Sequence, residues 1–296
     1  MNGGDIYTLS RILGHSSVIV TEKEYLDLNT NDLGSDHITH LKNDEFNKYI
    51  YLFIASITNR LSGKYNFNGE INDRRILREK IILPIDDNNE PNLDFINKYM
   101  RKLEENKKNS YISFATNKLK DLKYVNIQKL EEKEWKEVCI NDLFSVKIGK
   151  AIDGNKVDRV SGETPYINRK ETSNGLDGFI DYDESKLAKD FPVITIGNET
   201  AAPFVQSFQF FTGTKVNILT PKTDMSEGVL LFIATCLKQK KSKFNYSFTI
   251  NSTRLKKQTF LLPVNKNDKP DYEYMGKYVD NIRYVKYTDY ILYCSK

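Results

Sequence analysis

Residues 231–279 read LFIATCLKQKKSKFNYSFTINSTRLKKQTFLLPVNKNDKPDYEYMGKYV, and residues 52–100 read LFIASITNRLSGKYNFNGEINDRRILREKIILPIDDNNEPNLDFINKYM. At one constant offset the two stretches align without a gap and are identical at about 15 positions. The period between them is too long for a solenoid repeat. The sequence therefore indicates a duplicated domain.

Each copy predicts the same order of elements. A helix carries the Leu-Phe-Ile-Ala motif, a segment of alternating Asn and aromatic residues is extended, and a basic stretch leads into an apolar strand at 81–85 or 260–264. A polar turn then opens a second helix, with proline near its first turn, where proline is tolerated. The first copy lacks most of the sequence that precedes the second.

The second helix of each copy is amphipathic, because its apolar residues recur at helical spacing. We predict that the two helices pack as an antiparallel pair, and that their apolar stripes also dock another subunit. Packing inside the chain's own core is the alternative, and both can hold. The residues assigned to a subunit interface are Phe95, Tyr99, Leu103, Met275, Tyr278 and Ile282.

From Trp135 the composition changes to short apolar runs separated by turn residues. The stretch WKEVCINDLFSVKIGK predicts a short helix or turn and a strand. ETPYINRKETSNGLDGFID predicts two strands joined by a polar loop and an Asn-Gly turn, and residues 191–221 predict two or three strands. With the flanking helices, this β-rich body makes the expected fold class α+β.

Composition places the chain among globular proteins. Of its 296 residues 39% are hydrophobic and 28% charged, with a net charge of +4 that weakly favours a polyanionic partner. The sequence shows no signal peptide, and no apolar run approaches the roughly 20 residues of a membrane span. Three cysteines with no zinc-site spacing suit a reducing cytoplasm, and three histidines without a cluster predict no metal site.

These stretches resemble the specificity subunits of type I and related restriction-modification systems. The resemblance rests on EWKEVCINDLFSVKIGK, TPYINRKETSNGLDGFI and LFIAT…KFNYS…RLKKQTFLLPVNKNDKPDYEYM, and it covers about residues 36–296. It implies target recognition domains that read double-stranded DNA, and helices that dock a methyltransferase subunit in a complex that can include a restriction subunit. It also implies no catalysis by this chain and no cofactor of its own, since S-adenosylmethionine belongs to the methyltransferase.

The resemblance gives an expected domain order. Residues 35–90 are the C-terminal part of a truncated first recognition domain, 91–130 a spacer that is helical through about 108, 131–265 a complete recognition domain, and 266–296 a C-terminal helix. Here the chain departs from the family, which has two recognition domains in tandem. Two chains can restore that arrangement, so a homodimer is a hypothesis.

Specific DNA recognition needs cations on phosphates and forked polar groups at base edges. The β-rich body offers both in short stretches, and a basic pair recurs in the repeat as Lys64 and Arg75 of the first copy. A shared phosphate contact and a shared structural ion pair are both open for that pair. The candidate DNA-binding residues are Lys147, Lys150, Lys156, Arg159, Asn168, Arg169, Lys170, Lys243 and Arg254.

Residues 1–34 suggest a different class of function. GGDIYTLSRILGHSSVIVTEKEYLDL, residues 3–28, resembles the C-terminal end of tyrosine recombinases, in which a histidine and a tyrosine act on the scissile phosphate. Carried over, these are His15 and Tyr25. The arginines and lysine that such a site also needs are missing here, and a tyrosine hydroxyl is a poor nucleophile without activation. The alternative function is therefore an inactive or recombining specificity cassette fused to a recombinase remnant.

Overall fold

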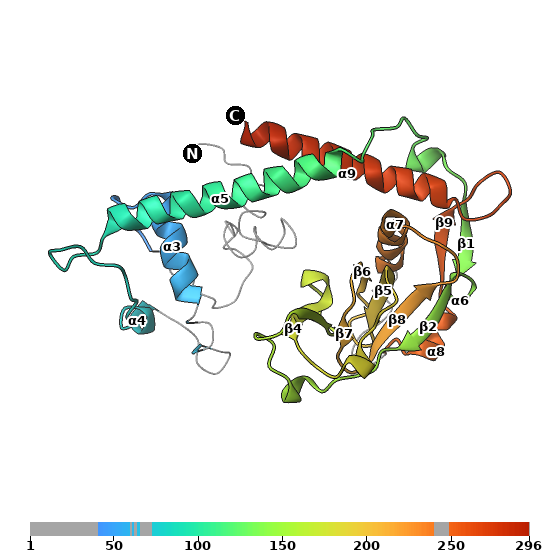
Figure 1. The fold of residues 1–296 in the computed structure, drawn as a ribbon, viewed down its shortest axis with the longest axis horizontal. Helices are drawn as coiled ribbons and strands as arrows, with labels where there is room; N and C mark the ends of the chain where they lie inside the picture. The colour runs from blue at the N-terminus through green and yellow to red at the C-terminus, as the bar shows by residue number, and fades with distance from the viewer. Residues whose placement is uncertain (1–40, 60, 62–63, 66–72, 240–248, 296) are drawn as a thin grey trace. The chain divides into compact units, whose positions relative to one another are not determined.

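The computed structural model describes residues 41–59, 61, 64–65, 73–239 and 249–295, and Figure 1 shows its helices and strands. The described residues divide into two compact units. The C-terminal unit is Asp121–Thr288. The N-terminal unit comprises the described residues up to Lys120 together with those from Asp289 onward. The fold class is α+β, as predicted.

In the described residues of the C-terminal unit, nine strands form three sheets. The largest has the order β2-β8-β5-β6 and is antiparallel, a second has the order β4-β3-β7 with β3 and β7 parallel, and β1 pairs with β9 alone. The strands are β1 (Trp135–Cys139), β2 (Phe144–Ile148), β3 (Thr164–Ile167), β4 (Leu176–Ile180), β5 (Val193–Gly197), β6 (Pro203–Gln206), β7 (Phe211–Thr212), β8 (Val216–Pro221) and β9 (Thr259–Pro263).

Residues 191–221 form four strands, β5 to β8, where the sequence predicted two or three. The extra strand, β7, has two residues and pairs with β3. So short a strand leaves no alternating pattern that a sequence can reveal. The predicted strand, polar loop, Asn-Gly turn and strand across residues 163–181 are confirmed as β3, a loop and β4.

Outside the undescribed stretch 240–248, the α-helices of the C-terminal unit are α6 (Ile140–Leu143), α7 (Glu227–Lys238), α8 (Ser252–Lys256) and α9 (Tyr272–Cys294), whose last residues fall in the N-terminal unit. Ser226 caps the start of helix α7, because its side chain accepts a hydrogen bond from the amide of Val229. This helix carries the Leu-Phe-Ile-Ala motif into the main core. That core joins α7, the four-stranded sheet, β9 and Met275 of α9 in one apolar cluster.

The N-terminal unit contains α3 (Lys48–Thr58), α4 (Asp73–Ile76) and α5 (Leu93–Leu119). Helices α3 and α5 pack through Ile50, Ile54 and Ile96. Helix α5 continues to Leu119, so the predicted end near residue 108 is wrong. Residues 101–119 contain neither Gly nor Pro, and ion pairs at i,i+4 spacing, such as Glu104–Lys108, support a helix with little buried surface.

The structure confirms the repeat beyond its sequence identity. Helices α3 and α7, α4 and α8, and α5 and α9 each begin at equivalent positions of the two copies. The isolated bridge between Ile85 and Pro91 has its counterpart between Val264 and Pro270, again at equivalent positions. The antiparallel pairing of α5 with α9 stays a prediction, since the two helices belong mainly to different units.

None of the helices in the described parts of the chain is both long and apolar enough to cross a membrane.

Candidate nucleic-acid interface

Three of the predicted DNA-binding residues converge on one carboxylate, Asp177 of β4. Lys170 Nζ lies 2.7 Å from Asp177 Oδ1, and Arg159 Nε lies 3.3 Å from Oδ2. Asn168 donates its side-chain amide to Oδ2 over 3.2 Å. The strand β4 therefore holds together two cations and an amide that come from two different loops.

Asp177 is largely shielded from solvent, with 13% of its side chain exposed. Burial by itself would raise the pKa of this carboxyl group. The hydrogen bonds from Lys170 and Asn168 and the charge of Arg159 outweigh burial, so the pKa lies below its ordinary value. Asp177 is consequently ionised at neutral pH and neutralises part of the charge around it.

A second carboxylate, Glu199, organises the neighbouring cations. Arg169 donates through Nη1 to Glu199, and Lys215 lies 3.7 Å from the same oxygen. Asp177 and Glu199 with their partners make a set of four cations and two carboxylates, so the set has a net positive charge. We call this set, Arg159, Arg169, Lys170, Lys215, Asp177 and Glu199, the charged cluster.

The charged cluster lies where several strands end. Residues 168–170 follow β3, Glu199 follows β5, and Lys215 lies between β7 and β8. The backbone is tightly packed there, since a Cβ placed on Gly213 would come within 2.6 Å of the Asn168 side-chain oxygen. Loops held on strand ends present their side chains in fixed positions, as recognition requires.

The Asn-Gly turn after these residues is structural, as the sequence predicted. Asn174 adopts a positive φ of 55°, and its side-chain amide donates to the backbone oxygen of Val205. Asn168 is also engaged within the protein, because its side-chain oxygen accepts from the Arg169 amide while its nitrogen binds Asp177. Both asparagines thus shape the loop that carries Arg169.

The other predicted cations lie around this body. Lys147 is exposed on β2, and Lys156 is exposed in a short 3-10 helix at Gly154–Lys156. Lys150 donates to the backbone oxygen of Ser185. These three side chains are not members of the charged cluster.

The structure describes only some of the cations that recur in the repeat. Lys243 lies outside the described residues. Its counterpart Lys64 forms an ion pair with Glu79 in the N-terminal unit, which favours the structural alternative there. Arg254 is exposed on α8 and donates to the backbone oxygen of Thr249.

The predicted interface stripe separates into two groups. Met275 is fully buried in the main core and Tyr278 packs against that core, so these two side chains serve the chain's own packing. Phe95 and Tyr99 are each 50% exposed, Leu103 is partly exposed and Ile282 is 46% exposed. Assigning Met275 to a subunit interface is therefore wrong, because helical spacing alone does not tell which neighbour covers a stripe.

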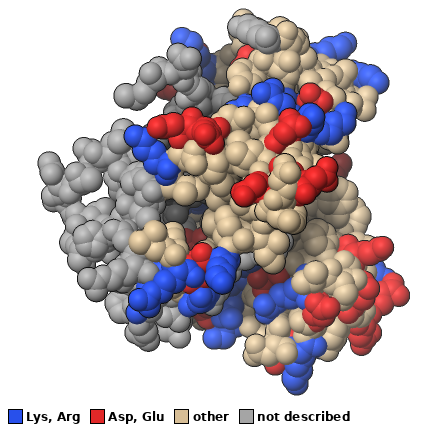
Figure 2. All heavy atoms as spheres, turned by 90° about the vertical axis from the view of Figure 1, so that its left-hand side faces the viewer, with Lys and Arg blue, Asp and Glu red and all other residues tan. Residues whose placement is uncertain are grey.

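Positive and negative side chains are mixed on the face of the molecule that Figure 2 draws. This mixture agrees with the small net charge of +4. Attraction to a polyanion must then come from local groups such as the charged cluster.

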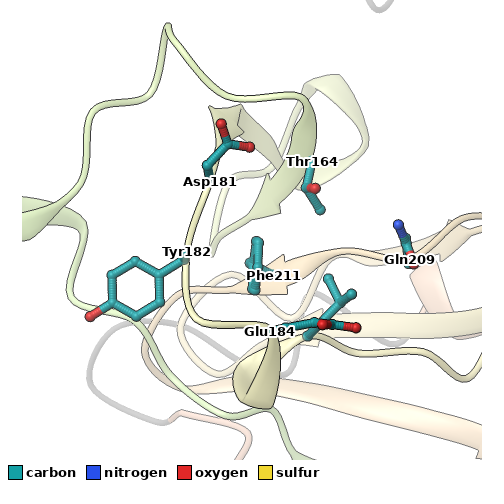
Figure 3. A pocket seen from close by; sticks show the side chains of 7 residues that line it. Thr164, Asp181, Tyr182, Glu184, Gln209 and Phe211 are labelled. Carbon is teal, nitrogen blue, oxygen red and sulfur yellow. The ribbon is translucent and has the colours of Figure 1, made fainter.

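A shallow pocket lies beside the three-stranded sheet β4-β3-β7. It is lined by Thr164, Asp181, Tyr182, Glu184, Leu187, Gln209 and Phe211. Figure 3 shows Asp181 and Glu184 among the lining side chains and the ring of Tyr182 turned away from Thr164 and Gln209. Two carboxylates without a lining cation disfavour a phosphate group. We assign no ligand to this pocket.

Asp177→Asn is expected to lower the free energy of unfolding at pH 7 by roughly 1–3 kcal/mol, since it removes a charged partner from Lys170 and Arg159. The pKa of Asp177 is lowered in the folded state. Its contribution is therefore complete above the ordinary value of 3.8 and is lost as the pH falls through the folded value. Urea unfolding followed by the fluorescence of Trp135, the single tryptophan, measures the difference. An equal difference between the two proteins at pH 7 and in strong acid would contradict this.

A family model described as "Type I restriction modification DNA specificity domain" matches residues 132–288, more than half of the chain. A curated relative, the "Type II restriction enzyme BgcI specificity subunit S.BcgI" of Heyndrickxia coagulans, is 54% identical over 144 residues. That match covers 48% of this chain and 42% of the relative, so the chain spans less than half the relative's length.

Two solved structures are also similar. The Type-I restriction-modification S subunit from M. genitalium is 18% identical with a TM-score of 0.37, over 48% of this chain and 37% of that one. The HsdS subunit from Thermoanaerobacter tengcongensis is 14% identical with a TM-score of 0.38, over 79% and 61%. At these TM-scores neither likeness supports an argument about the fold.

Proposed function

This chain belongs to the type I restriction-modification DNA specificity domain family, and on that premise we propose that it binds double-stranded DNA sequence-specifically and directs a methyltransferase complex to its target. The observation that carries this proposal is the charged cluster in the C-terminal unit. Two carboxylates, Asp177 and Glu199, hold its four cations in place. The loops that carry these groups lie where strands of the β-rich body end. A rigid basic loop at the end of a sheet suits a DNA groove better than a small-molecule site.

Within the charged cluster we assign base recognition to Arg169. A guanidinium has five N–H donors, and the bond to Glu199 uses Nη1 alone. The remaining donors can reach the two acceptors of guanine in the major groove. Asn168 fixes the loop by its bonds to Asp177 and to the Arg169 amide, so its role is positioning rather than contact with adenine.

The other cations are assigned to phosphates. Lys147, Lys150, Lys156, Arg159 and Lys170 lie on the same β-rich body, and Lys243 and Arg254 belong to the segment before β9. Phosphate contacts release counterions, so DNA affinity should fall steeply as salt rises. Such contacts fix register on the duplex without reading its sequence.

The chain is proposed to act in the cytoplasm without catalysis of its own. A methyltransferase subunit would dock on exposed apolar positions of α5 and α9, among them Leu103 and Ile282, and a restriction subunit can join that complex. S-adenosylmethionine would be bound by the methyltransferase. One complete recognition domain per chain also makes a homodimer a working hypothesis, which sedimentation in the presence of DNA tests.

Co-expression with a methyltransferase subunit, followed by mapping of methylated sites, tests the directing role. We expect a methylated motif that depends on this chain and changes in the Arg169→Ala variant. A split motif indicates two recognition domains in the complex, and a palindromic motif indicates a homodimer. A motif unchanged when the chain is omitted would contradict the proposal.

The alternative, a cassette fused to a recombinase remnant, concerns residues outside the described ranges. His15 and Tyr25 both fall there, and the family match begins only at residue 132. If the remnant were active, the protein would nick supercoiled DNA and Tyr25→Phe would abolish the nicking. We expect no nicking by either protein.

A further inference from the structure

The sequence predicted an apolar strand at residues 81–85, and that prediction is wrong, since this segment makes only an isolated bridge at Ile85. Residues 80–84 of the first copy are the counterparts of β9 and have no partner strand among the described residues. In the second copy β9 pairs along its whole length with β1. The side chain of Ile85 is 59% exposed, whereas its counterpart Val264 is 4% exposed. Among the described residues, the first copy therefore has no counterpart of the neighbour that covers the second copy.

The second copy identifies that neighbour as β1 and the turn before it. Trp135 stacks on Phe232 with ring centroids 6.1 Å apart, and Phe232 meets Tyr278 edge-on at 5.6 Å. Lys133 forms an ion pair with Asp271 and lies over the Tyr274 ring. One segment thus closes the strand edge and covers the aromatic side chains beside it.

The first copy has aromatic side chains at the same positions that β1 and its preceding turn cover in the second copy. Phe53 meets Tyr99 edge-on at 6.4 Å, and Phe95 lies against Tyr99 at 6.1 Å, as the equivalent aromatics do in the second copy. Phe95 and Tyr99 are each half exposed. We call this surface, residues 80–85 with Phe53, Phe95 and Tyr99, the acceptor surface.

A segment like β1 is present near the start of the chain. Residues 20–33, VTEKEYLDLNTNDL, align without a gap with residues 130–143, LEEKEWKEVCINDL, at an offset of 110. Six of the 14 positions are identical, and Tyr25 stands where the second copy has Trp135. The identical residues of the first segment are Glu22, Lys23, Glu24, Asn31, Asp32 and Leu33.

We propose that Thr21–Leu28 of this chain binds the acceptor surface as an antiparallel strand in the register of β1 on β9. Tyr25 then lies opposite Pro84 and packs on Phe53, and Asp27 lies opposite Ile82. This pairing places Asp27 diagonally across from Lys80, where opposite charges attract. It assigns Tyr25 to packing rather than to phosphoryl transfer.

A second copy of the chain does not fit this role. Each chain has one β1, which is already paired with its own β9. If one copy gave its β1 to the acceptor surface of another copy, its own β9 would lose its partner strand. Residues 21–28 would instead give each chain a second segment like β1 for its acceptor surface.

The proposal also accounts for the spacing of the repeat. After the two matched segments, the short stretch 34–47 leads to α3, whereas the much longer stretch 144–226 leads to α7. The longer stretch contains β2 to β8 and the whole charged cluster. The first copy is then a recognition domain that keeps its scaffold and lacks its DNA-reading body. The part of the chain that the structure describes contains one such body.

A pair of cysteines tests the proposed register. The bonds from the Ile140 amide to Gln258 and from the Val264 amide to Glu134 fix the hydrogen-bonded pairs of β1 and β9. Since such pairs alternate with non-hydrogen-bonded ones, Glu137 and Leu261 form a non-hydrogen-bonded pair with a Cα separation of about 4.5 Å. That separation suits a disulfide. The equivalent pair is Asp27→Cys with Ile82→Cys, both at positions whose counterparts face outward or bear charge.

The full-length double variant is oxidised with oxidised glutathione, and its disulfides are mapped by mass spectrometry of the monomer and dimer bands. We expect an intrachain bond between positions 27 and 82, retained with Tyr25→Phe and lost with Tyr25→Asp. In the control pair, Leu26→Cys with Ile82→Cys, the side chains face opposite sides and the bond should be lost. Absence of the 27–82 bond, equal bonding in the control, or a bond found only in dimers would overturn the proposal. The disulfide forms without DNA, so this test can fail while the proposed function holds, and the reverse is also true.

Discussion

The Met275→Ala variant is expected to lower the free energy of unfolding of the C-terminal unit by about 2–5 kcal/mol, the usual cost of truncating a buried methionine. Met275 is fully buried on α9, among residues of α7, β9 and the four-stranded sheet. Truncation leaves a cavity at the point where α9 joins the core. In urea the unfolding midpoint should fall with little change in slope, because the surface exposed on unfolding is nearly the same.

Trp135 fluorescence reports this transition, since the ring stacks on Phe232 in the same core. Ile282→Ala is the matched control on the same helix, because its side chain is 46% exposed and its truncation should cost much less. If both variants unfold at the wild-type midpoint, Met275 is not a core residue in solution, and the interface assignment made from the sequence returns.

Arg169→Ala is expected to weaken binding to the preferred DNA site by about 1–3 kcal/mol, or roughly fivefold to 150-fold, because a bidentate contact to one base is lost. Binding to unrelated DNA should change much less. The variant should also relax the sequence preference at a single base-pair position. Competition binding with duplexes that differ at one position measures both effects.

Lys147→Ala is the matched control for Arg169→Ala. Lys147 is exposed on β2 and is assigned to a phosphate, so its loss should weaken binding to all sequences alike and reduce the salt slope by about one. A uniform loss in Arg169→Ala as well would mean that Arg169 contacts the backbone. The base-reading role would then be wrong, although DNA binding would stand.

Much of the fold could be predicted because the sequence contains it twice. The two copies agree on a helix with Leu-Phe-Ile-Ala, an apolar strand, a polar turn and a second helix, and the structure places the equivalent helices and bridges at the same offset. The end of α5 was missed because helix propensity and ion pairs on an exposed face leave no periodic apolar pattern. Strand β7 was missed because it has only two residues.

The candidate site was predicted only in part, because its acids are distant in sequence from its cations. Asp177 follows Asn168 by nine residues and Glu199 follows Arg169 by 30, so neither appears beside the basic stretch. The contribution of Lys215 was likewise missed, since a single lysine in a turn carries no signal of its own. Strand pairing of β3 with β4 and of β5 with β8 brings these groups together. The role of Met275 was ambiguous for a related reason, since an amphipathic stripe does not specify its partner.

The most direct test of the central claim is selection of bound duplexes from a random-sequence DNA library by the full-length protein at moderate salt. Sequence-specific recognition by the C-terminal unit predicts enrichment of one short motif, and Arg169→Ala should lose the preference at one position within it. Recovery of all sequences in proportion to their input, by a protein that is folded and binds DNA, would contradict that claim.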